Sequence, residues 1–300
     1  MPTVAEEPPR RFLARARLRL DRDRRTVPCA AANIARNASA ETDRHRRWEP
    51  ARDALWQQLE PLITPGSRIA IVGAGNGDDL PLARIAAAAA EVVLIDLDPQ
   101  AARGARRRQG WRLARRIDVI GHDVTGGAAD RIAIAAAEDC APSPSPVTAE
   151  PLPGSPYDLV VGDLFYSQLL FPALVDLEVS TEQTDTYICR YGPPLTRAVV
   201  ARLHASAPAG QVLHLHDPIG WWESRPQPVE LNEILRLASE DTEAALELVA
   251  IGNGPSHTDP RPALLGLGLK PRRTALWRWP FAAGVDYLAC ATLAVGRGQI

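Results

Sequence analysis

The sequence predicts an α/β domain with a doubly wound sheet of seven strands, mostly parallel, that ends in an antiparallel hairpin strand. Five short apolar runs, each followed by residues with helical periodicity, predict five strand–helix units. Two more apolar runs near the end of the chain are joined by a short link, which predicts a hairpin. Strands that alternate with helices in this way predict a parallel sheet covered by helices on both faces.

Composition and charge limit the classes of protein to which this chain can belong. The 300 residues carry a formal net charge of −2, so charge gives no general argument for a nucleic acid or a membrane surface as a partner. The four cysteines are scattered without a Cys-x-x-Cys pair, which predicts neither a metal site nor a redox motif. No apolar run approaches the roughly 20 residues that cross a bilayer, and no signal peptide is evident. We therefore expect a cytoplasmic protein with reduced thiols.

Residues 1–64 are expected to form a basic tail followed by a helical segment. Apolar residues from Trp48 to Leu62 recur at helical spacing, which predicts a packing face. This segment either closes over a ligand site as a lid or covers the sheet, and the sequence leaves both interpretations open. Pro65-Gly66 ends it, and residues 65–300 are expected to form the ligand-binding domain.

A glycine-rich turn follows the first predicted strand, the apolar run at residues 69–72. Three glycines at positions 73, 75 and 77 precede Asp78 and Asp79, either of which is expected to cap a helix that begins near Leu80. Glycines let the backbone come close to a ligand, and a helix N-terminus offers unpaired N–H groups. The turn therefore predicts a site for a nucleotide-like ligand.

The spacing of these glycines indicates a ligand without phosphates. The dinucleotide fingerprint Gly-x-Gly-x-x-Gly would place its third glycine at Asp78. A carboxylate there would repel a pyrophosphate in a partly dry site. S-adenosylmethionine fits this constraint, because it carries adenine, a ribose with two free hydroxyls, and a cationic sulfonium on an amino acid.

Acidic residues also follow the second and third predicted strands. Asp96 ends the run at residues 92–96 and lies 19 positions after Gly77, close to the ~20 residues at which an acid meets a ribose in such folds. It can accept hydrogen bonds from both ribose hydroxyls, and capping of a turn is the alternative. Asp98 is expected to cap the next helix, over residues 99–109. After the strand at residues 117–120 comes His122-Asp123, where Asp123 is the candidate for the adenine amino group.

Polar and aromatic residues follow the fourth and fifth strands, predicted over residues 157–161 and 211–216. Ligands bind at the carboxyl ends of strands in open α/β sheets. The candidates for a reaction centre at these two strand ends are Asp163, Tyr166, Gln168, His216 and Asp217. Trp221 and Trp222 are expected either to stack on an aromatic or cationic acceptor or simply to pack.

The remaining segments complete the domain. Residues 141–156 are rich in proline and lie between a predicted helix and the fourth strand, so we expect an insertion within one domain. An irregular link is expected over 178–192, a helix over 194–205, and another over 230–249. A Gly/Pro-rich connection over 252–272 precedes the hairpin strands, which are expected at 274–279 and 286–295.

This layout resembles the class I S-adenosylmethionine-dependent methyltransferases over about residues 66–295. Gly73-Ala-Gly-Asn-Gly77 is similar to the glycine motif of that family, and Asp96 matches its ribose acid. Asp123 matches its adenine-side acid, and Gly162-Asp163 its fourth motif beside the methyl group. One position departs from the pattern, since Ile71 stands where the family often carries an acid, so the methionine end is expected to find other partners.

The resemblance implies a Rossmann-like fold, S-adenosyl-L-methionine as the cofactor, and a set of residues that bind it. That cofactor-binding set is Gly73, Ala74, Gly75, Asn76, Gly77, Asp78, Asp96, Leu97, His122, Asp123, Val124, Asp163 and Leu164.

We therefore predict a methyltransferase that acts on a small molecule, with catalytic candidates Asp163, Tyr166, His216 and Asp217. An RNA or protein acceptor is the second form of this hypothesis. An aminopropyltransferase of the spermidine-synthase type shares the implied fold and is an alternative. A cofactor-binding protein without catalysis is another. The acceptor and the oligomeric state stay open.

Overall fold

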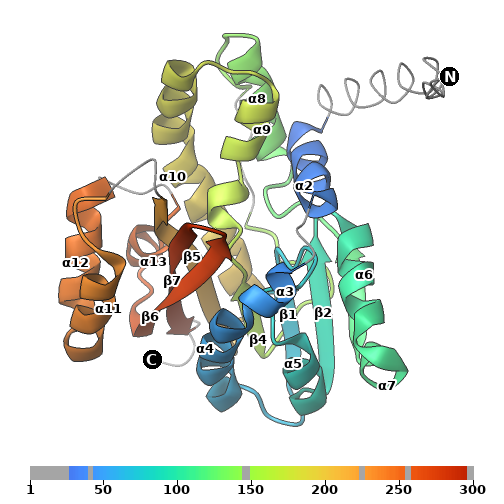
Figure 1. Cartoon of the computed structure of the whole chain (residues 1–300). Helices are drawn as coiled ribbons and strands as arrows, with labels where there is room; N and C mark the ends of the chain where they lie inside the picture. Colours follow the sequence, from blue (N-terminus) through green and yellow to red (C-terminus); the bar gives the residue numbers. More distant parts are fainter. Residues whose placement is uncertain (1–26, 40–42, 144–148, 223–226, 254–257, 296–300) are drawn as a thin grey trace, which may run out of the picture.

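The computed structural model describes residues 27–39, 43–143, 149–222, 227–253 and 258–295. Within them a single seven-stranded sheet runs through the molecule in the order β3-β2-β1-β4-β5-β7-β6 (Figure 1). The strands are β1 (Arg68–Val72), β2 (Glu91–Asp96), β3 (Ile117–Gly121), β4 (Leu159–Gly162), β5 (Gln211–Trp222), β6 (Pro271–Ala282) and β7 (Val285–Val295). The first five are parallel, and β7 is antiparallel to both β5 and β6. The predicted fold class is confirmed.

Helices lie on both faces of this sheet (Figure 1). From the N-terminus they are α2 (Pro28–Ala38), α3 (Arg44–Arg47), α4 (Glu49–Leu59), η1 (Glu60–Leu62), α5 (Leu82–Ala88), α6 (Pro99–Arg108), α7 (Gly110–Ala114), α8 (Ala128–Ala137), η2 (Tyr166–Gln168), α9 (Phe171–Asp176), α10 (Thr181–Ser206), α11 (Leu231–Glu240), α12 (Thr242–Asn253) and α13 (Arg261–Gly266). Among the described residues, none of the helices has the length and hydropathy that crossing a membrane requires.

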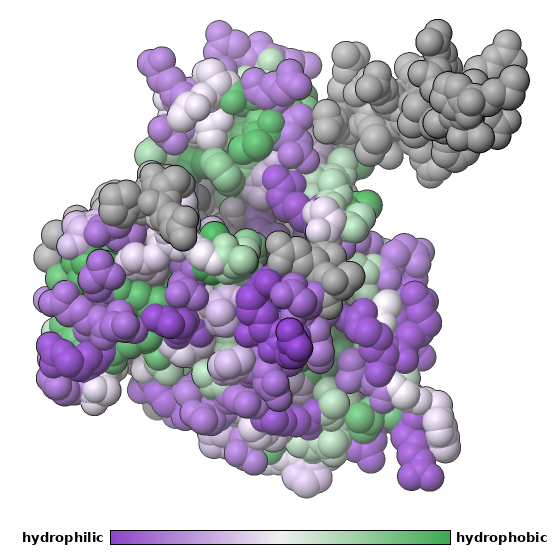
Figure 2. Space-filling view, viewed as in Figure 1, coloured by the Kyte–Doolittle hydropathy of each residue, from purple (hydrophilic) through white to green (hydrophobic). Residues whose placement is uncertain are grey.

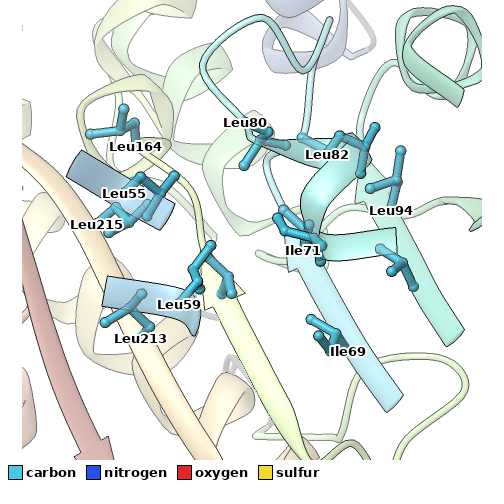
Figure 3. Packing of buried hydrophobic residues seen from close by; sticks show 14 of the residues in the cluster. Leu55, Leu59, Ile69, Ile71, Leu80, Leu82, Leu94, Leu164, Leu213 and Leu215 are labelled. Carbon is cyan, nitrogen blue, oxygen red and sulfur yellow. The ribbon is translucent and has the colours of Figure 1, made fainter. Parts of the chain in front are cut away.

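Alternation along the strands divides the core into two layers. On β1, Ile69 and Ile71 face the layer that holds α4 and α5, whereas Ala70 and Val72 face the layer that holds α10. Figure 3 shows Leu55 and Leu59 of α4 beside the strands of the first layer. Helix α4 thus packs against the sheet as part of its core. The predicted basic tail lies outside the described residues.

Helix α10 corrects the prediction for residues 178–192. The structure has one helix from Thr181 to Ser206, with Pro193 and Pro194 inside it, where an irregular link and a later start were expected. A proline removes one backbone donor and disfavours a helix interior, so this pair predicted a break. Residues before and after the prolines, among them Ile188, Leu195 and Val199, are buried on one side of the helix, and this packing stabilises it across the prolines.

Two other boundaries differ from the prediction. The helix expected over 230–249 is two helices, because Asp241 accepts hydrogen bonds from the amides of Glu243 and Ala244 and so starts α12. The connection expected over 252–272 contains α13. The hairpin is confirmed, although its strands are longer than predicted. The Pro-rich segment 141–156 lies between α8 and β4, as expected, and residues 144–148 of it are not described.

The fifth strand also extends beyond its predicted end. Asp217-Pro218 was expected to close it at His216, yet β5 pairs with β7 as far as Trp222. The register shifts between His216 and Ile219, so Asp217-Pro218 forms an irregularity within the strand. Both residues of this irregularity line the cavity described below.

Candidate functional site

A cavity lies at the carboxyl ends of the strands, where the strand order reverses between β1 and β4. Its volume is about 790 Å³. The glycine turn after β1, the segment after β4, the irregularity in β5, the β6–β7 hairpin and the N-terminal helices α2 and α3 all contribute lining residues. The surface beside it is apolar over α9 (Figure 2), where Phe171 and Val175 are exposed.

The glycine turn is held close to its neighbours by backbone hydrogen bonds. The Gly73 amide donates to Ile95 O at 2.9 Å, and the Asp163 amide donates to Val72 O at 2.8 Å. Gly73 has φ of +82°, and a Cβ on it would lie 2.8 Å from the Cβ of Phe165. Only glycine therefore fits this position, both for conformation and for space.

Asp96 fixes the turn from the end of β2. Its Oδ2 accepts a hydrogen bond from the Gly75 amide at 2.8 Å, and its Oδ1 accepts one from the Asp98 amide at 2.7 Å. Burial raises the pKa of Asp96, and these two amides act against that shift. Each carboxylate oxygen has a second lone pair. Asp96 lines the cavity, so the expected ribose role stays a prediction beside this structural one.

Asp78 does not cap the following helix, which corrects that prediction. Helix α5 begins at Leu82 with Pro81 before it. The Asp78 carboxylate instead accepts hydrogen bonds from Arg44 Nε at 2.8 Å and Arg108 Nη2 at 3.2 Å. These arginines compensate its charge, so repulsion of a pyrophosphate would come from other acids in the cavity.

Asp79 and Asp163 are those acids. Asp163 is 2% exposed, and neither of its carboxylate oxygens has a hydrogen-bond partner among the described residues. Burial, with Asp79 and Asp96 nearby, raises the pKa of Asp163 well above its ordinary value. Burial likewise raises the pKa of Asp79 to about 6. Both line the cavity, so it presents a cluster of poorly compensated carboxyl groups beside the glycine turn.

The backbone beside Asp163 is strained. Leu164 has φ of +49°, a left-handed conformation that residues with a Cβ rarely adopt. Strain of this kind gathers at binding and active sites, where the surrounding structure holds it. Leu164 also lines the cavity, and its contact with the cofactor stays a prediction.

The N-terminal helix α2 contacts the glycine turn directly. Asn76 Nδ2 donates to Asn37 O at 3.0 Å, and Asn37 Nδ2 donates to Asp98 Oδ2 at 3.1 Å. Asp98 also accepts hydrogen bonds from two amides at the start of α6, as its predicted capping role requires. Helix α2 is thus one wall of the cavity. That it moves as a lid remains a prediction.

A narrow slot of about 40 Å³ adjoins the cavity at Asp96. Leu97, His122, Asp123 and Val124, all from the predicted cofactor-binding set, line it. The slot is narrower than a purine, so binding of a base there requires the lining side chains to move apart.

Asp123 has a structural role at this slot. Its Oδ1 accepts hydrogen bonds from Thr125, and its Oδ2 accepts one from the Gly127 amide at 2.5 Å. These bonds hold the turn before α8. The contact with an adenine amino group stays a prediction.

Two of the four catalytic candidates lie outside the residues that line the cavity. Tyr166 is 1% exposed, and its hydroxyl makes a hydrogen bond with His214 Nδ1 at 2.5 Å, while His214 Nε2 contacts His204 Nε2 at 3.1 Å. His216 is fully buried, with its Nε2 3.6 Å from Asp259 Oδ1, and burial lowers its pKa to about 4. Both side chains are buried and lie outside the cavity lining, so their catalytic roles stay predictions that the lining does not support.

Asp217 lies in the irregularity of β5 and lines the cavity. Its Oδ2 accepts a hydrogen bond from Ser167 Oγ at 3.1 Å, and its Oδ1 has no partner among the described residues. Burial raises its pKa to about 7. A carboxyl group with this pKa is suited to take up and release a proton near neutral pH. Ser167 was not predicted, since a serine beside Tyr166 carries no signal of its own.

Aromatic side chains form the far wall of the cavity. They are Trp48, Trp222, Trp279, Phe281 and Tyr287. Of the predicted pair, Trp221 instead packs beneath α11 and donates its Nε1–H to Val229 O at 2.9 Å. The hairpin aromatics were not predicted from the sequence, because the pairing of β6 with β7 brings them together only in the fold.

Comparison with known proteins finds similarity among solved structures alone. No protein-family model and no curated protein sequence matches the chain. Among solved structures, magnesium protoporphyrin IX methyltransferase from Synechocystis, crystallised with S-adenosylhomocysteine, is 13% identical with a TM-score of 0.43, and the match covers 82% of each chain. The N-methyltransferase NodS from Bradyrhizobium japonicum, also with S-adenosylhomocysteine, is 11% identical with a TM-score of 0.38 over 81% of this chain and 85% of that one. An O-methyltransferase family protein from Burkholderia thailandensis is 13% identical with a TM-score of 0.42 over 89% of this chain and 60% of that one.

The seven-stranded sheet with its antiparallel C-terminal hairpin is the one that the sequence resemblance implied. The chain has the Rossmann-like methyltransferase fold.

Proposed function

We propose that this protein is an S-adenosylmethionine-dependent methyltransferase. The observation that carries the proposal is the Asp163 carboxylate, buried and without a hydrogen-bond partner among the described residues, beside the glycine turn at the point where the strand order reverses. A buried carboxyl group without a partner is costly, and a cationic ligand that pairs with it removes that cost.

The residues present fit such a ligand along one path through the site. The slot at Leu97 and Val124 supplies apolar walls for a base, and Asp96 lies where slot and cavity meet. Asp163 and Asp79 then offer carboxylates to an amino group. These two carboxylates supply a partner for the methionine end of the cofactor, although Ile71 stands where class I methyltransferases often carry an acid.

The arginines of the N-terminal helices favour a cofactor that keeps its carboxylate. Arg36 of α2 and Arg44 and Arg47 of α3 line the cavity. A guanidinium has five N–H donors, so an arginine that pairs with one carboxylate retains donors for another. A decarboxylated cofactor, which an aminopropyltransferase uses, would leave this feature without a role.

The buried acids weigh against a dinucleotide. Asp79, Asp96 and Asp163 lie at the same end of the sheet as the glycine turn, and their burial weakens the screening of their charges. A pyrophosphate placed beside them would be repelled.

Asp217 is the proposed general base, in place of His216. When bound, S-adenosylmethionine would supply an electrophilic methyl group, and the role of the chain is to hold an acceptor and take its proton. Asp217 faces the cavity, and Ser167 holds its Oδ2, so its Oδ1 is the oxygen available to an acceptor. The aromatic wall encloses the space beside it, which favours a small-molecule acceptor over RNA or a protein.

Calorimetric titration tests the cofactor. S-adenosylmethionine and S-adenosylhomocysteine are expected to bind the folded chain, whereas NAD⁺ and decarboxylated S-adenosylmethionine are expected to bind at least about tenfold more weakly. Tight binding of the decarboxylated compound would favour aminopropyl transfer. Absence of binding by either methionine compound, in a sample shown by circular dichroism to be folded, would refute the proposal.

A further inference from the structure

The aromatic wall forms a connected box around one end of the cavity. Trp48 and Trp279 lie 5.0 Å apart between ring centroids, Trp48 and Phe281 5.8 Å, and Phe281 and Tyr287 5.1 Å. Trp222 lies 6.1 Å from Tyr287. The pairs range from stacked to edge-on, so ring faces and ring edges both border the space. Ring faces carry negative potential and attract cations.

Tertiary contacts fix this box. Trp48 donates its Nε1–H to Phe281 O at 3.0 Å, which joins the start of α4 to the end of β6. Arg47 Nη2 donates to the same carbonyl at 3.1 Å. Phe281 is the most exposed member at 38%, while Trp48 and Trp279 are each 5% exposed. A preorganised box of this kind binds without ordering its side chains at that moment.

The charges in the cavity are unbalanced. Among the described lining residues are five carboxylates and three arginines. The arginines are already paired, Arg36 with Asp176 at 3.4 Å, Arg44 with Asp78 at 2.8 Å and Arg47 with Asp43 at 3.0 Å.

Four carboxyl groups of the cavity therefore have no salt bridge within the described residues: Asp79, Asp96, Asp163 and Asp217. S-adenosylmethionine carries one net positive charge, so its binding would leave part of this imbalance in place. Asp217 lies at the aromatic end. It neighbours Tyr287, whose pKa its charge helps to raise.

We infer that the methyl acceptor of the proposed reaction is a protonated amine attached to an apolar or aromatic group. The inference rests on the proposed function. Asp217 attracts the ammonium group, and the box of Trp48, Trp222, Trp279, Phe281 and Tyr287 holds the carbon skeleton. Both the carboxylate and the rings favour binding of an ammonium ion, because a half-buried carboxylate and aromatic ring faces each stabilise a cation where water is scarce.

The same carboxylate then takes part in the reaction. The ammonium loses one proton to Asp217 Oδ1, and the nitrogen lone pair forms the new C–N bond. The carbon–sulfur bond of the sulfonium breaks, and its electron pair stays on sulfur. The products are a methylated ammonium and a neutral thioether, so charge and atoms balance.

Other acceptors fit the site less well. An acceptor that carries a carboxylate would bring a further negative charge among carboxyl groups that already lack cationic partners. A neutral alcohol of the same shape would gain burial against the rings but nothing from Asp217.

The test compares three probes that share a ring and differ in charge: 2-phenylethylamine, 2-phenylethanol and phenylacetate. Each is titrated by calorimetry into the chain saturated with S-adenosylhomocysteine, which separates recognition from turnover. Larger aryl amines extend the series. The amine is expected to bind at least about tenfold more tightly than the alcohol, with phenylacetate weakest.

Two variants, each with a matched control, sharpen the test. Asp217→Asn is expected to remove most of the preference for the amine, whereas Asp118→Asn, at an exposed position on β3, is expected to keep it. Trp222→Leu is expected to weaken all three probes, whereas Trp111→Leu, at a position 68% exposed on α7, is expected to weaken none. Binding of S-adenosylhomocysteine is measured for every variant and is expected to stay unchanged.

The outcomes separate the two claims. If S-adenosylhomocysteine binds but no amine binds more tightly than its matched alcohol, the amine inference is refuted while the cofactor proposal stands. Equal preference in Asp217→Asn and the parent chain also refutes it. If the folded parent chain does not bind S-adenosylhomocysteine, both the amine inference and the cofactor proposal are refuted. The amine is then incubated with S-adenosylmethionine in one sample and with decarboxylated S-adenosylmethionine in another, and its mass is measured. Gain of a methyl group in the first sample supports the inference, whereas gain of an aminopropyl group in the second alone contradicts it.

Discussion

The Gly75 amide donates a hydrogen bond to Asp96 Oδ2 at 2.8 Å, across 21 positions of sequence. This bond ties the glycine turn after β1 to the end of β2. One carboxylate thereby sets the shape of the turn and stands at the junction of cavity and slot. A substitution of Asp96 is consequently expected both to disturb the glycine turn and to weaken the binding of a nucleoside.

Asp96→Asn is expected to lower the free energy of unfolding by roughly 1.5–3 kcal/mol, the usual worth of hydrogen bonds to a charged group. An amide offers one acceptor oxygen where two amide donors need one each. Chemical denaturation monitored by circular dichroism measures the effect, and Asp118→Asn on β3 is the control. Equal stability of the two variants would show that the turn does not depend on Asp96.

Gly73→Ala is expected to destabilise the chain by about 1–3 kcal/mol, because a Cβ would meet Phe165 at 2.8 Å and the backbone is left-handed. Gly66→Ala is the control, since nothing lies within 4 Å of the place that a Cβ would take there and its φ lies outside the left-handed range. It is expected to be neutral or stabilising by up to about 1 kcal/mol. The same unfolding curves report both variants, and a neutral Gly73→Ala would contradict the close approach.

Asp217 gives the stability of the chain a pH dependence of known sign. Its pKa is raised to about 7 by burial, so between its unfolded pKa, about 4, and pH 7 the folded chain holds a proton that the unfolded chain releases. The stability linked to this group is present below that window and is lost as the pH rises through it. The stability of Asp217→Asn relative to the parent chain is expected to increase from pH 5 to pH 8. Thermal denaturation of both proteins across that pH range measures this difference. A difference that does not change with pH would mean that Asp217 is ionised throughout.

Tyr166→Phe is expected to lower stability by about 1–3 kcal/mol, because His214 Nδ1 loses its partner at a fully buried position. Binding of S-adenosylhomocysteine and the amine preference are expected to stay unchanged, since Tyr166 does not line the cavity. Tyr187→Phe, whose hydroxyl bonds Cys140 O at an exposed site, is the control for loss of a hydroxyl. A loss of binding without a loss of stability in Tyr166→Phe would restore Tyr166 as a residue of the site.

Much of the fold follows from local sequence signals. Short apolar runs predicted all seven strands, and their order with the intervening helices predicted the sheet. Acids at strand ends predicted Asp96 and Asp163 in the site, because parallel strands bring their carboxyl ends to one edge. Helix α10 was predicted only in part, since packing of Ile188 and its neighbours outweighs the local cost of Pro193-Pro194.

Other parts of the site depend on geometry that the sequence does not encode locally. The irregularity at Asp217-Pro218 lies within β5, and there Asp217 lines the cavity while the neighbouring His216 is buried. The aromatic box joins Trp48 to Phe281, 233 positions apart. In the sequence, neither residue can be distinguished from an aromatic residue that simply packs in the core. The box is therefore recognised only in the tertiary structure.

Binding of S-adenosylhomocysteine to Asp163→Asn tests the central claim most directly. The proposed ligand binds because its amino group pairs with a buried carboxylate that lacks any other partner among the described residues. Calorimetry is expected to show an affinity at least about tenfold lower in Asp163→Asn than in the parent chain. The affinity of Asp118→Asn is expected to be unchanged. Asp163→Asn is also expected to keep the stability of the parent chain, because a neutral amide costs less to bury than a carboxylate. Equal affinity of Asp163→Asn and the parent chain would contradict the account.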